Sequence, residues 1–254
     1  MTAFQKSMIT VSIMLATIMQ ALDTTIANVA LPHMQGALSA TQEQATWILT
    51  SYIVAAAIMT SPIGILAARI GRKRLFMASV AGFTFASILC GIATGLTEMV
   101  VFRLLQGVFG AALVPLSQSV LLDINPKEKH GQAMAMWGVG VMLGPILGPT
   151  LGGWLTEYYN WRWVFYINVP IGIAAFIGMG VFMDETEKTP ARRFDAFGFL
   201  MLSLFIGSLQ LLLDRGQSKD WFSSTEIIIE TIVEIESIIL ILFLISCLFE
   251  LFTN

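Results

Sequence analysis

Two charged side chains lie inside apolar segments of this 254-residue chain, and together they could bind and release a proton. Asp23 is the only formal charge between Lys6 and Glu43, and Arg103 is the only one in 99–122. An intramembrane carboxylate costs about 2.5–3.5 kcal/mol on insertion scales, so it should face protein or water. Burial favours its neutral form unless a cation lies beside it. We predict that Asp23 couples to protons or substrate; the alternative is a static ion pair that only fixes helix packing.

The positions of the two charges along their segments place them within reach of each other. At a rise of 1.5 Å per residue, Arg103 lies about 7 Å and Asp23 about 15 Å below the same membrane surface. A long guanidinium side chain covers most of that difference. Gln20 and Gln106 lie three residues from Asp23 and Arg103, on the same helix faces. We therefore expect an Asp23–Arg103 pair; the alternative is that Arg103 extends to the outer interface.

A glycine-rich run, GVGVMLGPILGPTLGG at 138–153, is typical of a helix packed closely against another helix in a bilayer. Four glycines recur at every fourth residue and form a stripe without side chains along one face of the helix, the glycine stripe: Gly140, Gly144, Gly148 and Gly152. Pro145 and Pro149 each remove one helical donor, so we expect a broken or bent helix. Such helices are tolerated at membrane depth only inside a protein or beside a water-filled cavity. The run indicates a polytopic transporter.

The composition places these residues in a bundle of transmembrane helices. The chain is 56% hydrophobic and 12% charged, about half the charge fraction of soluble domains. Seven windows are long enough to span a bilayer: 9–33, 45–67, 75–96, 99–122, 132–154, 163–183 and 196–213. An eighth, 227–249, contains three glutamates in its first half, which we expect in the outer headgroup region.

The distribution of cations predicts the orientation. With a cytoplasmic N-terminus, ten Lys and Arg residues fall in inside segments and three in outside loops. We expect a multi-pass protein of the inner or plasma membrane. Its predicted parts are a six-span bundle at 1–183, a cytoplasmic linker at 184–195, and two additional central spans at 196–254, the last of them atypical. The fold class is an all-α polytopic membrane protein.

The inner segment between the second and third spans concentrates positive charge. Its residues of interest are Gly64, Arg69, Gly71, Arg72, Lys73 and Arg74. Cations at a helix C-terminus complement the helix dipole, and they fix the orientation of the chain in the membrane. These two effects would explain the charges of the segment but not its two glycines. No phosphate-binding loop, Cys/His spacing or nucleophile motif occurs, so we predict no enzyme activity, cofactor, metal site or nucleic-acid partner.

These motifs resemble the drug:proton antiporters of the major facilitator superfamily, in particular the fourteen-span EmrB/QacA type. The similar segments are 22–32, 64–74, 103–107, 140–153 and 161–170, which include Asn28, Gly153 and Asn168. The resemblance implies a six-helix N-terminal bundle that exports amphipathic or cationic drugs in exchange for protons. Asp23 would be the protonated carboxylate, tuned by Arg103, in a cavity with Gln20, Asn28 and Gln106. The glycine stripe would let span five flex.

Two departures from this family affect the functional prediction. Position 68 is Ala68, where the family commonly carries an acid, which weakens a charge latch in that loop. The family also has a second six-span bundle, and this chain stops after its eighth window. We expect an inactive truncation, with pairing to a second copy or to a separately encoded C-terminal half as alternatives. A non-transporting membrane assembly partner is the competing function.

Overall fold

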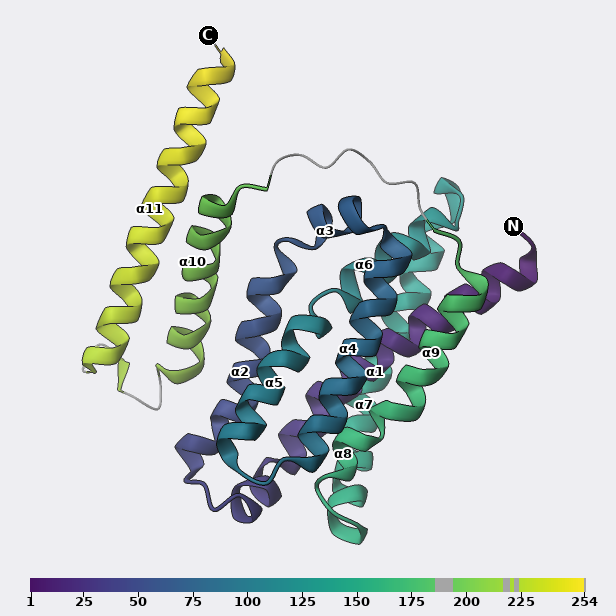
Figure 1. Cartoon of the computed structure of the whole chain (residues 1–254), viewed down its shortest axis with the longest axis horizontal. Helices are drawn as coiled ribbons and strands as arrows, with labels where there is room; N and C mark the ends of the chain where they lie inside the picture. Colours follow the sequence, from purple (N-terminus) through teal and green to yellow (C-terminus); the bar gives the residue numbers. More distant parts are fainter. Residues whose placement is uncertain (186–193, 217–219, 222–223, 254) are drawn as a thin grey trace.

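The computed structural model describes residues 1–185, 194–216, 220–221 and 224–253, with the backbone alone for 241–253, and every regular element in them is helical (Figure 1). The elements are α1 Ala3–Ala37, α2 Gln42–Thr60, α3 Ile63–Ile70, α4 Arg72–Ile92, α5 Leu96–Gly110, α6 Leu113–Asp123, η1 Lys127–Lys129, α7 His130–Tyr158, α8 Trp163–Tyr166, α9 Asn168–Phe182, α10 Ala196–Arg215 and α11 Thr225–Thr253.

Seven of these segments could cross a membrane, in agreement with the seven predicted windows. Six are long and apolar enough as they stand, and the bent pair α2–α3 makes the seventh. The eighth window, 227–249, falls in α11, whose side chains after residue 240 are outside the described residues. The predicted linker at 184–195 likewise lies outside them at 186–193. The division of the chain at these positions stays a prediction.

Prolines mark two of the helix breaks. The α2–α3 pair bends by 60° at Ser61 and Pro62. Span four also breaks, at Ala111 and Ala112, which was not predicted. Pro115 explains it, because this residue has no N–H to donate to the carbonyl of residue 111.

The sequence predicted a broken or bent helix in span five. A break is wrong, because α7 continues as one helix through Pro145 and Pro149. Its most extensive contacts are with α1, which supports it along its length. The Thr25 hydroxyl of α1 donates to the Gly144 carbonyl at 3.1 Å. Tertiary packing therefore holds the helix together although two of its backbone hydrogen bonds are missing.

The central position of α1 determines where the polar site lies. This helix packs against α7, α9, α6 and α2, while α4 packs against α5 and α9. One apolar cluster includes Met19 of α1, and a second begins at Leu22 of the same helix. Asp23 is therefore placed where the two clusters meet. A capping box between Thr41 and Gln44 fixes the start of α2, which brings its middle to the same level.

Helix α10 packs on α2 at one side of the bundle (Figure 1). At its end, Arg215 lies 3.3 Å from Glu43 and also contacts Glu226 of α11. Its guanidinium carbon is 4.8 Å from the ring centroid of Trp47. This cluster joins both later helices to the start of α2.

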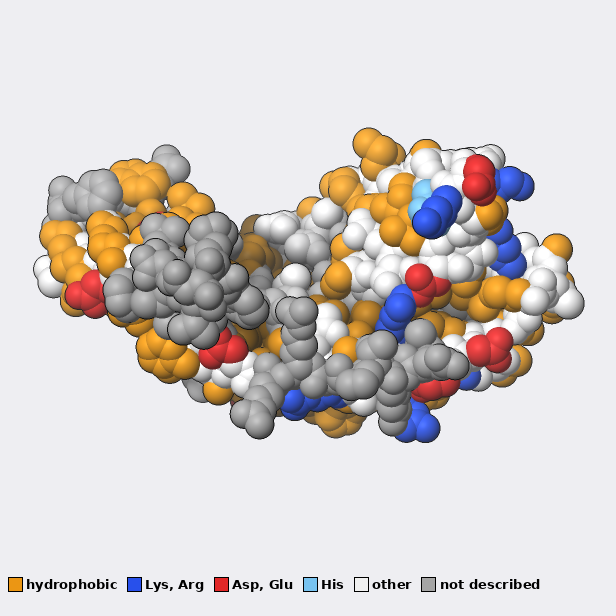
Figure 2. Space-filling model, turned by 90° about the horizontal axis from the view of Figure 1, so that it is seen from above, with side chains coloured by type: hydrophobic (Ala, Val, Ile, Leu, Met, Phe, Trp, Pro, Cys, Tyr) orange, Lys and Arg blue, Asp and Glu red, His pale blue; other side chains and the backbone are white. Residues whose placement is uncertain are grey.

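Cations gather at the opposite end of the bundle, where α1 and α4 begin, α3 ends and η1 lies. Figure 2 looks onto that end and shows basic and acidic side chains among apolar ones. The arrangement supports the predicted cytoplasmic side, although the direction across the membrane stays a prediction.

Candidate functional site

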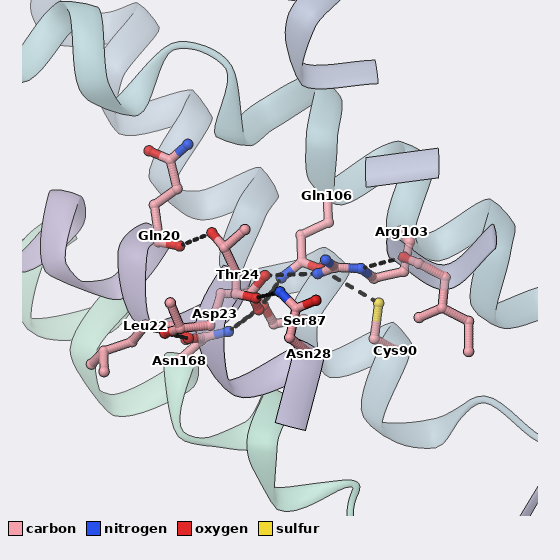
Figure 3. A network of polar contacts seen from close by, with 12 residues as sticks. Gln20, Leu22, Asp23, Thr24, Asn28, Ser87, Cys90, Arg103, Gln106 and Asn168 are labelled. Atoms are coloured by element: carbon pink, nitrogen blue, oxygen red, sulfur yellow. Dashed lines mark hydrogen bonds and ion pairs between the residues drawn. The ribbon is translucent and has the colours of Figure 1, made fainter. Parts of the chain in front are cut away.

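The two intramembrane charges form an ion pair inside the bundle. Arg103 Nη1 of α5 lies 2.7 Å from Asp23 Oδ2 of α1, and each residue is only 1% exposed. In Figure 3 the two side chains approach each other from separate helices. The expected contact is therefore present, and Arg103 does not extend to the outer interface. Removing one partner of such a pair costs about 3–5 kcal/mol, because it leaves a buried uncompensated charge.

Three further side chains complete the network around Asp23. Gln106 Nε2 and Asn168 Nδ2 both donate to Asp23 Oδ1, at 2.8 and 2.7 Å. Ser87 Oγ accepts from the same two amides, at 2.7 Å from Gln106 and 3.2 Å from Asn168. Every contact made to Asp23 comes from a donor, which suits a carboxylate that only accepts. The network joins α1, α4, α5 and α9.

Arg103 is also fixed from the side of α2. Its Nε donates to the carbonyl of Ile48 at 3.0 Å, and its guanidinium carbon lies 4.3 Å from the ring centroid of Tyr52. The Phe165 ring of α8 is 5.8 Å away. The arginine is therefore held by a carbonyl, a carboxylate and two aromatic faces, through its Nε, its Nη1 and the plane of its guanidinium group.

Two predicted cavity residues lie outside this network. The Gln20 amide oxygen is buried and has no hydrogen-bond partner among the described residues. Asn28 is exposed, and its amide donates to the Thr24 carbonyl of its own helix at 2.7 Å. Their role in a substrate cavity stays a prediction.

The glycine stripe of α7 packs directly against α1. All four glycines of the stripe are buried. A Cβ built on Gly144 would lie 2.5 Å from the Cβ of Ala21, and one on Gly148 would collide with Thr25. Gly153 is different, since a Cβ there would meet nothing within 4 Å. Pro145 and Pro149 are exposed, away from this contact.

The basic segment between α3 and α4 ties three helices together. Arg72 contacts Asp123 of α6 and donates to Ser119 at 3.0 Å. Lys73 donates to the Gly180 carbonyl of α9 at 2.9 Å, and Arg74 lies 3.3 Å from Glu185. Asp123 thus supplies the acidic partner that this loop lacks at Ala68.

The two glycines of that segment differ in whether the structure requires glycine at the position. Gly71 separates α3 from α4 with φ of 99°, a conformation that favours glycine. Gly64 has open space at its Cβ position, so packing does not require glycine there. Arg69 is exposed.

The comparison of the sequence with known families decides its membership. Residues 13–253 match the family described as Major Facilitator Superfamily. The chain belongs to the Major Facilitator Superfamily. Within this superfamily it is similar to the Multidrug export protein EmrB of Escherichia coli (strain K12), with 45% identity over 235 residues that cover 92% of this chain and 46% of that protein.

A second relative and two solved structures agree with this membership. The Fatty acid resistance protein FarB of Neisseria gonorrhoeae is 47% identical over 221 residues, 87% of this chain and 44% of that protein. The chain thus spans about half the length of the curated relatives it matches. A crystal structure of a peptide transporter POT mutant with sulfate superposes with a TM-score of 0.65 at 17% identity, over 89% of this chain and 49% of that one. A bacterial homologue of the lysosomal transporter Spinster gives 0.57 over 86% and 57%. These likenesses show the superfamily fold.

Ser87 and Asn168 were not among the predicted site residues of this superfamily member. Asn168 stood within a recognised motif, and it is the only amide side chain in the window 163–183. That isolation was a usable signal. Ser87 gave none, because serine is common in transmembrane helices.

Proposed function

We propose that this chain is the proton-coupled part of a multidrug efflux antiporter. It would exchange protons for amphipathic or cationic small molecules. The single observation that carries the proposal is the buried Asp23, whose charge is balanced by Arg103 in the middle of an apolar bundle. The export and resistance functions in the names of EmrB and FarB support an amphipathic substrate.

The chemistry of coupling follows from the shared carboxylate. A proton that binds Asp23 removes the negative half of the ion pair and leaves Arg103 with a carbonyl, Gln106 and aromatic rings. The buried cation then lacks its counter-charge, which favours any rearrangement that restores one. When Asp23 is protonated, the positive charge of Arg103 is uncompensated and repels a cationic substrate nearby. Binding of the cationic substrate and protonation of Asp23 therefore oppose each other. That opposition is what antiport needs.

The contact between α1 and α7 lies beside the site. Because the α7 stripe has no side chains, α1 packs directly on it, through Ala21 and Thr25 at Gly144 and Gly148 and through the Met14 side chain at Gly140. Alternating access in this superfamily moves one bundle against another around a central site. Transport would therefore require a second bundle in addition to the one described here.

A proton-release measurement tests the proposal on the chain itself. The purified chain in weakly buffered detergent is mixed with ethidium, a lipophilic cation, in the presence of a pH-sensitive dye. We expect ethidium binding to release protons, and we expect Asp23→Asn to abolish the release. The matched control Glu157→Gln changes an exposed acid in the same way and should release protons like the unmodified chain.

The outcomes separate the two functions. Release that persists in Asp23→Asn, or an absence of ethidium binding, contradicts the antiporter. A non-transporting assembly partner would release no protons when ethidium is added, either as the unmodified chain or as Asp23→Asn.

A further inference from the structure

Asn168 keeps one hydrogen-bonding group unused in the centre of the polar network. The residue is 0% exposed, and its Nδ2 donates to both Asp23 and Ser87. Its Oδ1 is buried and has no hydrogen-bond partner among the described residues. A buried carbonyl oxygen without a donor is unfavourable, so an acceptor left open beside a titratable carboxylate indicates a second state in which it is used.

The other amide of the network cannot play this part. Gln106 uses its Nε2 toward Asp23 and Ser87, while its Oε1 accepts from Arg103 Nη1 at 2.6 Å. Turning that amide over would point its NH2 group at a guanidinium that only donates. Asn168 can turn without meeting a guanidinium. Its oxygen has no donor to lose, and the two hydrogen bonds that its Nδ2 gives to Asp23 and Ser87 are lost in the turn, so other hydrogen bonds to the oxygen must replace them.

The contacts of Asp23 also determine which of its oxygens is available to a proton. Arg103 occupies Oδ2, whereas the two amides meet at Oδ1. Besides Arg103 from α5, the titratable groups that interact with Asp23 among the described residues are Tyr52 from α2 and Cys90 from α4, both uncharged near neutral pH. A proton therefore avoids the side of Arg103 and arrives at Oδ1, next to Asn168.

We propose that Asn168 is a positioning residue that follows the protonation of Asp23 by turning its amide. This inference rests on the proposed proton coupling. When a proton from the aqueous side binds Oδ1, the new O–H needs an acceptor, and the Nδ2 donor now faces a hydrogen. A half-turn about Cβ–Cγ places Asn168 Oδ1 there to accept from Asp23. The Ser87 hydroxyl keeps the hydrogen bond from Gln106 and turns its own hydrogen toward the same oxygen. Loss of the proton reverses both steps.

Infrared difference spectroscopy tests this on the full chain in lipid nanodiscs. The chain carries asparagine labelled with ¹³C at the side-chain carbonyl, and spectra are recorded at acidic minus neutral pH. We expect two bands to appear together: the carboxylic C=O of protonated Asp23 and a label-shifted asparagine carbonyl. Both should vanish in Asp23→Ser, which introduces no labelled amide.

Two variants assign the asparagine band. Asn168→Met should lose the labelled band and keep the carboxylic band, whereas Asn28→Met, which removes an exposed amide, should keep both. If the carboxylic band appears without a labelled band, or if the labelled band survives in Asn168→Met, the inference is overturned while proton binding stands. If no carboxylic band appears, the proposed function fails with it. Should Asn168→Met not fold, the band is assigned by elimination: it belongs to Asn168 if it survives in Asn28→Met, Asn125→Met, Asn160→Met and Asn254→Met, and the inference is overturned if one of these removes it.

Discussion

Alanine at Gly144 should destabilise the bundle, whereas alanine at Gly153 should not. The two glycines belong to the same run of α7, but only Gly144 faces α1, with 2.5 Å between its built Cβ and the Cβ of Ala21 and 2.7 Å to the Ala21 carbonyl carbon. Both of these atoms belong to a rigid backbone region, so the helices must separate. Overpacking of this kind costs about 1–3 kcal/mol. At Gly153, with nothing within 4 Å, the gain in helix propensity of up to about 1 kcal/mol remains.

The assay is thermal unfolding of the purified chain in detergent, followed by far-UV circular dichroism. For a chain of this size 1 kcal/mol corresponds to about 2–4 °C in midpoint, so we expect Gly144→Ala to unfold several degrees lower than Gly153→Ala. Equal midpoints for the two variants would show that α7 does not rest on α1 through this stripe. A destabilised Gly153→Ala would refute the assignment of faces on α7.

Three other perturbations test separate parts of the structure. Asp23→Asn and Arg103→Gln should each cost about 3–5 kcal/mol of unfolding free energy, with the double variant well short of their sum; additive losses would mean that the pair does not interact. Gly71→Ala should cost about 1–3 kcal/mol because of its positive φ, while Gly64→Ala should be neutral or stabilising in the same thermal assay. Arg215→Met should speed amide hydrogen exchange at the start of α11 and at the end of α10, measured by mass spectrometry, and unchanged exchange there would show that its contacts do not hold these helices.

The sequence predicted the paired charges because a charge in a membrane helix is costly, so its position alone constrains its surroundings. Counting residues along the spans placed Asp23 and Arg103 within reach, and the structure brings them together. The same reasoning did not identify Asn168 and Ser87 as residues of the site. An amide or hydroxyl costs much less than a charge in such a helix and often serves only packing. Which of them meets the carboxylate depends on how α9 and α4 pack, and no spacing within one segment fixes that.

The errors in reading helix continuity have a related cause. Proline removes a hydrogen bond wherever it occurs, but its effect on the helix depends on neighbours. At Pro115 the helix breaks after α5, whereas α7 continues through Pro145 and Pro149. Around Pro145, α1 packs along α7 and its Thr25 hydroxyl donates to the Gly144 carbonyl. The sequence shows where a break can occur; the tertiary contacts decide whether it does.

The glycine-stripe contact and the carboxylate, on which the proposed function depends, occupy opposite faces of a single helix. Ala21 and Thr25 of α1 touch the α7 stripe, and Asp23 lies two residues from each, about 200° around the helix. One face therefore packs directly on the glycine stripe of α7, and the other carries the carboxylate toward α5 and α9. If α1 itself moves relative to α5 and α9, Asp23 moves away from Arg103 and Asn168, and the contact of α1 with the α7 stripe changes in the same movement unless α7 follows. Proton binding and helix movement are then two consequences of where one helix lies, which is the mechanical requirement that the proposed antiport has to meet.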